Sequence, residues 1–75
     1  MSCELRQLTV NALRDEALGN IQKARVNVEI YLHNPAGIGE HSDVLAAIQD
    51  QLDIIAKQEE RIDVLDKYFV NHDHD

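Results

Sequence analysis

The sequence has very few of the residues that cross-link, break or stiffen small proteins. Cys3 is the single cysteine, so no disulfide can form within the chain. Glycine occurs three times, proline once and aromatic residues three times among 75 residues. Stability therefore has to come from burial of aliphatic side chains, and one core of this size supplies only about 3–5 kcal/mol. Because this length excludes a second core, we expect a single domain over residues 1–75.

The sequence also lacks an excess of positive charge and any long apolar run. Seven Lys and Arg residues stand against 14 Asp and Glu residues, which gives a formal charge of −7. Nucleic acids and anionic membrane surfaces both attract Lys and Arg, so we expect direct binding to neither. No run approaches the roughly 18 apolar residues of a membrane-spanning helix, and the first residues lack a signal-peptide pattern. These features predict a soluble, cytoplasmic protein.

The residues that favour turns are concentrated near the middle of the chain. Pro35 disfavours helical geometry at Asn34, and Gly37 and Gly39 permit a turn. We expect a helix on each side of this turn. The predicted segments are a first helix over residues 4–33, a turn over 34–41, a second helix over 42–70 and a frayed tail over 71–75.

Apolar residues recur at three- and four-residue spacings on both sides of the turn, which is the period of a helical face. In the second predicted helix a seven-residue repeat indicates supercoiled packing against another helix. Two helices of similar length joined by a short turn favour an antiparallel pair. The expected fold class is therefore all-α, an antiparallel two-helix hairpin. Its predicted seam consists of Val10, Leu13, Ala17, Ile21, Ala24, Val28, Tyr31, Ile48, Leu52, Ile55, Ile62, Leu65 and Phe69.

Two places in the predicted helices each leave an alternative open. Gly19 lies inside the first helix, and a break there gives three helices, although an interior glycine costs only about 1 kcal/mol. Gln58 and Glu59 interrupt the apolar repeat of the second helix. We expect both to be solvated at the edge of the seam; the alternative is a buried polar layer that sets register.

A second apolar set lies on the side of the first predicted helix that faces away from the seam. A two-helix hairpin leaves it uncovered, so we expect two hairpins to pair about a twofold axis as a homodimeric four-helix bundle. The alternatives are docking to a different protein, or a monomer in which residues 4–33 fold back on themselves. The expected interaction residues are Leu5, Leu8, Ala12, Val26 and Ile30, with Ile38 in the turn.

No residue pattern indicates catalysis or cofactor binding. Hydroxyl side chains of Ser and Thr occur only at positions 2, 9 and 42, and none lies in a nucleophile motif. An antiparallel hairpin brings the two chain ends together, and these ends carry residue types that bind metals. The residues in question are Cys3, Glu4, His72 and His74. Nothing in the sequence supplies the hydrogen-bonding partners that orient metal ligands in an evolved site. We therefore expect a non-enzymatic protein without catalytic residues, cofactor or metal site, with metal-dependent assembly as an alternative.

Charge is unevenly distributed between the two predicted helices. Residues 4–33 carry four acidic and four basic side chains, whereas residues 42–70 carry seven acidic and three basic side chains. An acidic helical surface of this kind suggests a further alternative, a regulator that mimics nucleic acid and blocks a basic site on a host enzyme.

The turn and its flanking sequence resemble one group of viral proteins. The matching parts are Gly19-Asn20-Ile21, Tyr31-Leu32-His33, Asn34-Pro35-Ala36-Gly37-Ile38-Gly39-Glu40-His41 and Asp66-Lys67-Tyr68-Phe69. They resemble small helical-hairpin proteins of marine contractile-tailed bacteriophages. The resemblance implies no activity and no functional residue for this chain. The resemblance implies a phage accessory protein in the infected bacterial cell or in the virion. Its partner would then be a second copy of the chain or, as the alternative, a larger viral or host protein.

Overall fold

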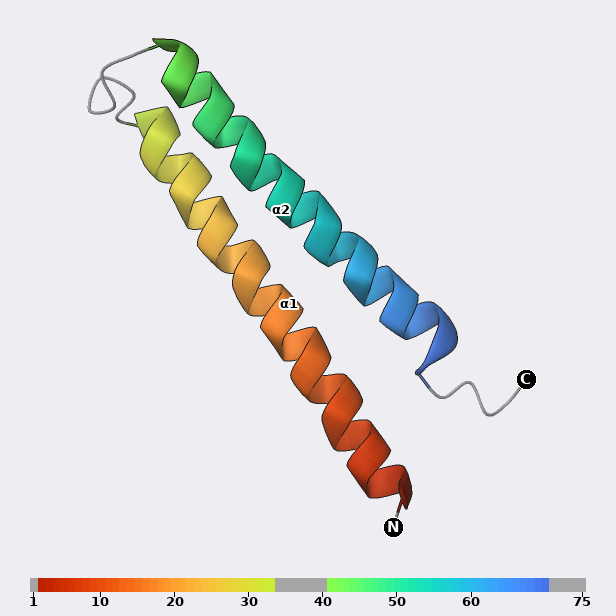
Figure 1. The fold of residues 1–75 in the computed structure, drawn as a ribbon. Coiled ribbons are helices and arrows are strands. Elements are labelled where there is room, and N and C mark those ends of the chain that lie inside the picture. The colour runs from red at the N-terminus through yellow and green to blue at the C-terminus, as the bar shows by residue number, and fades with distance from the viewer. Residues whose placement is uncertain (1, 34–40, 71–75) are drawn as a thin grey trace.

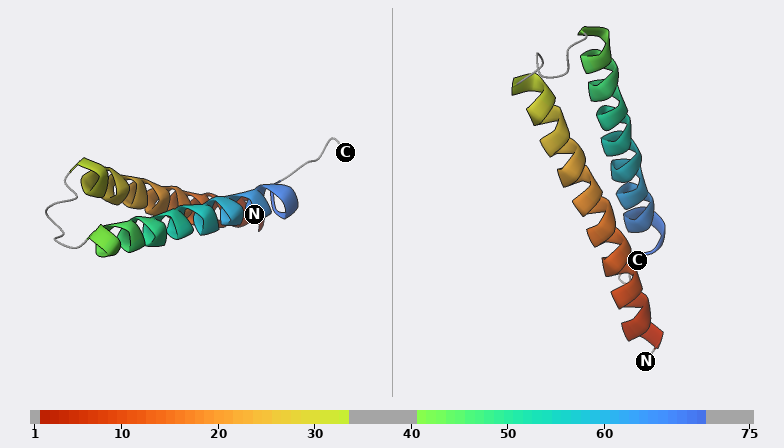
Figure 2. Two further views of the ribbon diagram at one scale, coloured as in Figure 1. Left: turned by 90° about the horizontal axis from the view of Figure 1, so that it is seen from above. Right: turned by 60° about the vertical axis from the view of Figure 1, so that its left-hand side comes forward.

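A computed structural model describes residues 2–33 and 41–70 and contains, in those ranges, two helices and no strand. Helix α1 spans Ser2–His33 and helix α2 spans His41–Tyr68. The helices lie side by side and run in opposite directions (Figure 1), within an envelope of 54 × 20 × 14 Å. Both views of Figure 2 show them separating toward the end where α1 stops and α2 begins. The predicted all-α antiparallel hairpin is thus confirmed.

The helix bounds follow the local chemistry of the sequence. Helix α1 continues through Gly19 without a break, as expected from the small cost of one glycine. Helix α2 begins at His41, one residue earlier than predicted, and ends at Tyr68. At its end the amides of Phe69 and Val70 both donate to the carbonyl of Leu65, at 2.9 and 3.1 Å. These two bonds occupy a carbonyl that the helix end leaves without an intrahelical partner.

The core is a narrow line of side chains between the two helices. In α1 the buried residues are Val10, Ala17 and Ala24, spaced seven apart. Ala17 and Ala24 are only 1% and 2% exposed, and these small side chains let the two backbones approach closely. In α2 the buried apolar residues are Val44 and Leu65. Because no large side chain of the described residues is fully buried, the hairpin alone encloses little apolar volume.

Most of the predicted seam lies in or beside this core. Half-buried positions on both helices flank the buried line, while Leu13, Leu52 and Phe69 are about half exposed. The half-buried members of the predicted seam are Ile21, Val28, Tyr31, Ile48, Ile55 and Ile62.

The prediction that Gln58 is solvated is wrong. Its side chain is 8% exposed and its Oε1 atom has no hydrogen-bond partner among the described residues, whereas Glu59 is exposed as expected. Gln58 lies seven residues before Leu65 and fourteen after Val44, so it occupies the same heptad position as these two buried residues. The deepest line of α2 therefore includes a polar residue, and the isoleucine repeat predicted as the centre of the seam lies at its edge.

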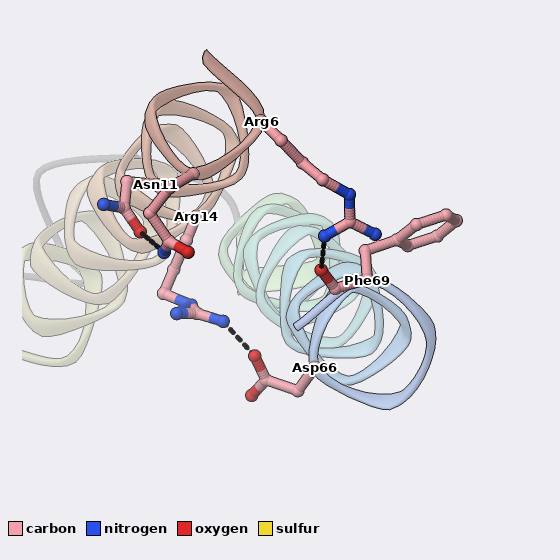
Figure 3. Close-up of polar contacts among 6 residues, drawn as sticks. Arg6, Asn11, Arg14, Asp66 and Phe69 are labelled. Carbon is pink, nitrogen blue, oxygen red and sulfur yellow. Dashed lines mark hydrogen bonds and ion pairs between the residues drawn. The ribbon is translucent and has the colours of Figure 1, made fainter. Parts of the chain in front are cut away.

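Polar contacts join the two helices along their length. Arg6 donates to the carbonyl of Phe69 at 2.7 Å, and Arg14 forms an ion pair with Asp66. Figure 3 shows the two arginines extending from α1 on either side of the seam toward the end of α2. Farther along, the side-chain amide of Asn27 donates to Gln51 at 3.1 Å. These contacts link residues of the two helices that the antiparallel register brings side by side.

Candidate interaction surface

One apolar surface of α1 faces away from α2, and we call it the back face. The back face consists of Leu5, Leu8, Ala12, Gly19, Val26 and Ile30. All six residues are exposed, and the four large side chains, Leu5, Leu8, Val26 and Ile30, expose between 56% and 67% of their surface. In helical register these residues lie roughly opposite the buried line of Val10, Ala17 and Ala24. The hairpin therefore cannot cover them.

Four polar side chains surround Gly19 in the middle of the back face. Asp15 and Glu16 lie four and three residues before it, and Gln22 and Lys23 lie three and four after it. These are the nearest neighbours on a helix surface. Asp15 and Gln22 share one flank of the back face, while Glu16 and Lys23 share the other. The apolar residues thus form two groups separated by a small, polar-edged centre.

The C-terminal half of the back face is hollowed. A depression of about 380 Å³ is lined by Val26 and Ile30 together with Gln22, Arg25, Glu29 and His33. The polar side chains are tied along the helix: Arg25 donates to Gln22 at 3.3 Å, and His33 Nδ1 lies 2.8 Å from the Glu29 carbonyl. Apolar side chains edged by polar residues that are already ordered make a suitable receptor for an apolar side chain of a partner.

A second exposed apolar group was not predicted as a surface from the sequence, and one of its members, Leu52, was assigned there to the seam. It consists of Leu18 and Leu32 on α1 with Leu45 and Leu52 on α2, all at least 46% exposed, and we call it the leucine flank. Leu18 lines a shallow cleft with Ile62 and Glu59. Leu32 follows Leu18 by two heptads, and Leu45 and Leu52 precede Glu59 by two heptads and one. All four leucines therefore lie on this side of the hairpin. Their spacing in multiples of seven residues is the sequence pattern from which the group could have been predicted.

Two of the exposed seam residues lie on the opposite side of the hairpin. Leu13 and Phe69 line a cleft of about 340 Å³ with Arg6, Thr9, Val10 and Leu65. The hydroxyl of Thr9 donates to the carbonyl of Leu5 at 2.8 Å, so it is engaged with its own helix. The cleft offers apolar surface and no positioned nucleophile.

The predicted tail over residues 71–75 and all of the predicted turn except His41 lie outside the described residues. Ile38, His72 and His74 lie outside the described residues, as does the side chain of Cys3. Among the side chains that the structure does place, no group of three or more His, Cys, Asp or Glu residues could hold a metal ion. Neither described helix combines the length and the apolar character needed to cross a bilayer.

Comparison of the chain with protein families, with curated proteins and with solved structures gave no match. The likeness to phage proteins stays a prediction from the sequence.

Proposed function

We propose that this protein is a non-enzymatic interaction module that docks another protein surface through the back face of α1. The observation that carries the proposal is the exposure of Leu5, Leu8, Val26 and Ile30 on one side of a single helix. Burying a side chain of this size contributes about 1.5–3 kcal/mol relative to leaving it in water. Four such residues are the kind of surface that soluble proteins use for association.

The small core of the hairpin also supports a role in association. Among the residues whose burial is described, five apolar residues are buried, and two of them are alanines. Domains of this length commonly need stabilisation beyond their own core, from a disulfide, a metal or a partner subunit. An exposed apolar surface can provide the last of these through association. A partner on the back face would bury further apolar area of α1, whose own buried side chains are small.

The test replaces Leu8 and Ile30 with aspartate. Both side chains point away from the core, so we expect the circular dichroism spectrum to keep its helical form while association is lost. Val64→Asp is the matched control, because Val64 is an exposed apolar residue of α2. Association is measured by light scattering on a sizing column. Equal loss in Leu8→Asp/Ile30→Asp and in Val64→Asp would contradict the proposal.

Photo-cross-linking identifies what lies on the back face without assuming its identity. A benzophenone amino acid at position 8 should give cross-links in the expressing cell, and the same probe at position 64 should not. Mass spectrometry of the products distinguishes a second copy from another protein. A third probe at the exposed acidic position 50 of α2 tests the acidic-regulator alternative. If cross-links form there and not at position 8, and are lost in cell lysate as salt is raised, that alternative is supported and the role of the back face is contradicted.

A further inference from the structure

We infer that the occupant of the back face is a second copy of this chain, with the two α1 helices packed antiparallel and crossing at Gly19. The inference rests on the proposed function, because it requires that the back face docks a protein. The arrangement of residues on either side of Gly19 identifies the docked protein as a second copy.

The apolar residues of the back face are distributed symmetrically about Gly19. Ala12 and Val26 lie seven residues to either side, and Leu8 and Ile30 lie eleven residues to either side. A twofold axis through Gly19, perpendicular to the helix, reverses α1 and brings each residue opposite its counterpart. Ala12 of one chain then faces Val26 of the other, and Leu8 faces Ile30. The small residue meets the larger one, and Leu8 enters the depression that Val26 and Ile30 line.

Gly19 suits the point at which the two helices come closest. A Cβ atom built there would meet nothing within 4 Å in the single hairpin, so packing within the chain does not require glycine at this position. Glycine in a helix interior is less favourable than alanine. Contact with another backbone is a situation in which the missing side chain is an advantage.

The charged residues beside Gly19 favour the antiparallel orientation. Glu16 and Lys23 share one flank of the back face, so reversal places Glu16 of each chain beside Lys23 of the other. On the other flank, Asp15 meets the amide of Gln22. A parallel pair would instead bring Glu16 level with Asp15 of the second copy, and like charges repel. Within the described part of a single chain, neither Glu16 nor Lys23 has an ion-pair partner.

The distribution of net charge also favours contact through α1. Residues 4–33 carry four acidic and four basic side chains, whereas residues 42–70 carry an acidic excess. Two copies that meet through α1 join their neutral helices. Because the back face lies opposite the seam, the two acidic α2 helices are then on the outer sides of the assembly, where their repulsion is smallest. The four helices form an elongated row with the α1 pair at its centre.

Charge exchange tests the orientation. We expect Glu16→Lys and Lys23→Glu each to raise the dissociation constant of the dimer on the order of tenfold, because each creates two repulsive pairs. The double variant Glu16→Lys/Lys23→Glu restores opposite charges across the axis and should return the constant to near the wild-type value. Analytical ultracentrifugation measures all four proteins. Additive loss in the double variant would overturn the antiparallel arrangement.

A cross-link tests the crossing point. In a Cys3→Ser background, Gly19→Cys should form a covalent dimer on mild oxidation, since a disulfide requires Cα atoms within about 7 Å. Glu60→Cys, on an exposed part of α2, is the control and should stay monomeric on a denaturing gel. Equal cross-linking at both positions would overturn the inference. A monomeric wild-type chain would overturn it too, while cross-links from position 8 to a different protein would leave the proposed function standing.

Discussion

Gln58 is the residue at which the core is least well satisfied. Its carboxamide is buried on the central line of α2, and its Oε1 atom accepts no hydrogen bond from the part of the chain that the structure describes. Such an acceptor costs about 1–3 kcal/mol when it is removed from water without a partner. We expect Gln58→Met, which keeps the length of the side chain, to raise the free energy of unfolding by about 1–2 kcal/mol.

Urea denaturation of Gln58→Met measures this effect, with Gln51→Met as the control. Gln51 is half buried and accepts a hydrogen bond from Asn27 at 3.1 Å, so the same exchange there should give little or no gain. A loss of stability in Gln58→Met would contradict this expectation and show that the carboxamide has a stabilising partner.

Gly19 should respond in opposite directions in the monomer and in the dimer. Alanine is the better helix former by about 1 kcal/mol, and its Cβ has open space in the single hairpin. We therefore expect Gly19→Ala to stabilise the hairpin at dilute concentration and to weaken its self-association. Thermal unfolding at low concentration and sedimentation at high concentration measure the two effects. Weakened unfolding stability and unchanged association would contradict both the helix argument and the crossing point.

At the scale of the elements, two arginines of α1 hold the end of α2. Arg6 donates to a carbonyl just past the helix end, where the helix dipole is negative, and Arg14 pairs with Asp66. Side-chain exposure of 28% for Arg14 and 52% for Asp66 limits the strength of this pair. We expect Arg6→Ala and Arg14→Ala each to lower the free energy of unfolding by about 0.5–1 kcal/mol.

Amide hydrogen exchange localises the arginine effect. Protection should fall mainly in the last turns of α2 in both variants, with the middle of α2 unchanged, because terminal turns open without global unfolding. Lys57→Ala is a suitable control, since this residue is exposed in mid-helix. Uniform loss of protection along α2 would contradict a local role for Arg6 and Arg14.

The two helices and their direction were predictable because spacing and turn residues act locally. Pro35 and the nearby glycines predicted the interruption between the helices, and sevenfold apolar spacing predicted a paired helix. The rotation of α2 about its axis was not predictable in the same way. Its isoleucine repeat and the line through Val44, Gln58 and Leu65 differ by less than one residue step around the helix, and the alanines of α1 decide which line lies deepest.

The candidate surface was predictable only in part for a related reason. All residues of the back face belong to α1 and lie opposite its buried residues, so their exposure could be predicted once the seam was identified. The leucine flank combines residues of both helices, and its continuity depends on their relative register. That register brings together residues far apart in the sequence, such as Arg14 and Asp66, and residue spacing does not specify such pairings.

For the whole molecule, the formal charge of −7 gives the response of self-association to salt a definite sign. Two copies repel each other at long range, and this repulsion is screened over about 10 Å at 0.1 M ionic strength. The Glu16 and Lys23 pairs are few and exposed, so their own screening removes little. We therefore expect the dimer to be as tight or tighter at 0.5 M sodium chloride than at 0.05 M. A complex between the acidic surface of α2 and a basic partner would weaken steeply over the same range. Sedimentation of the wild-type chain across this series separates the two, and a dimer that dissociates as salt rises would exclude apolar packing through α1 as its main source of stability.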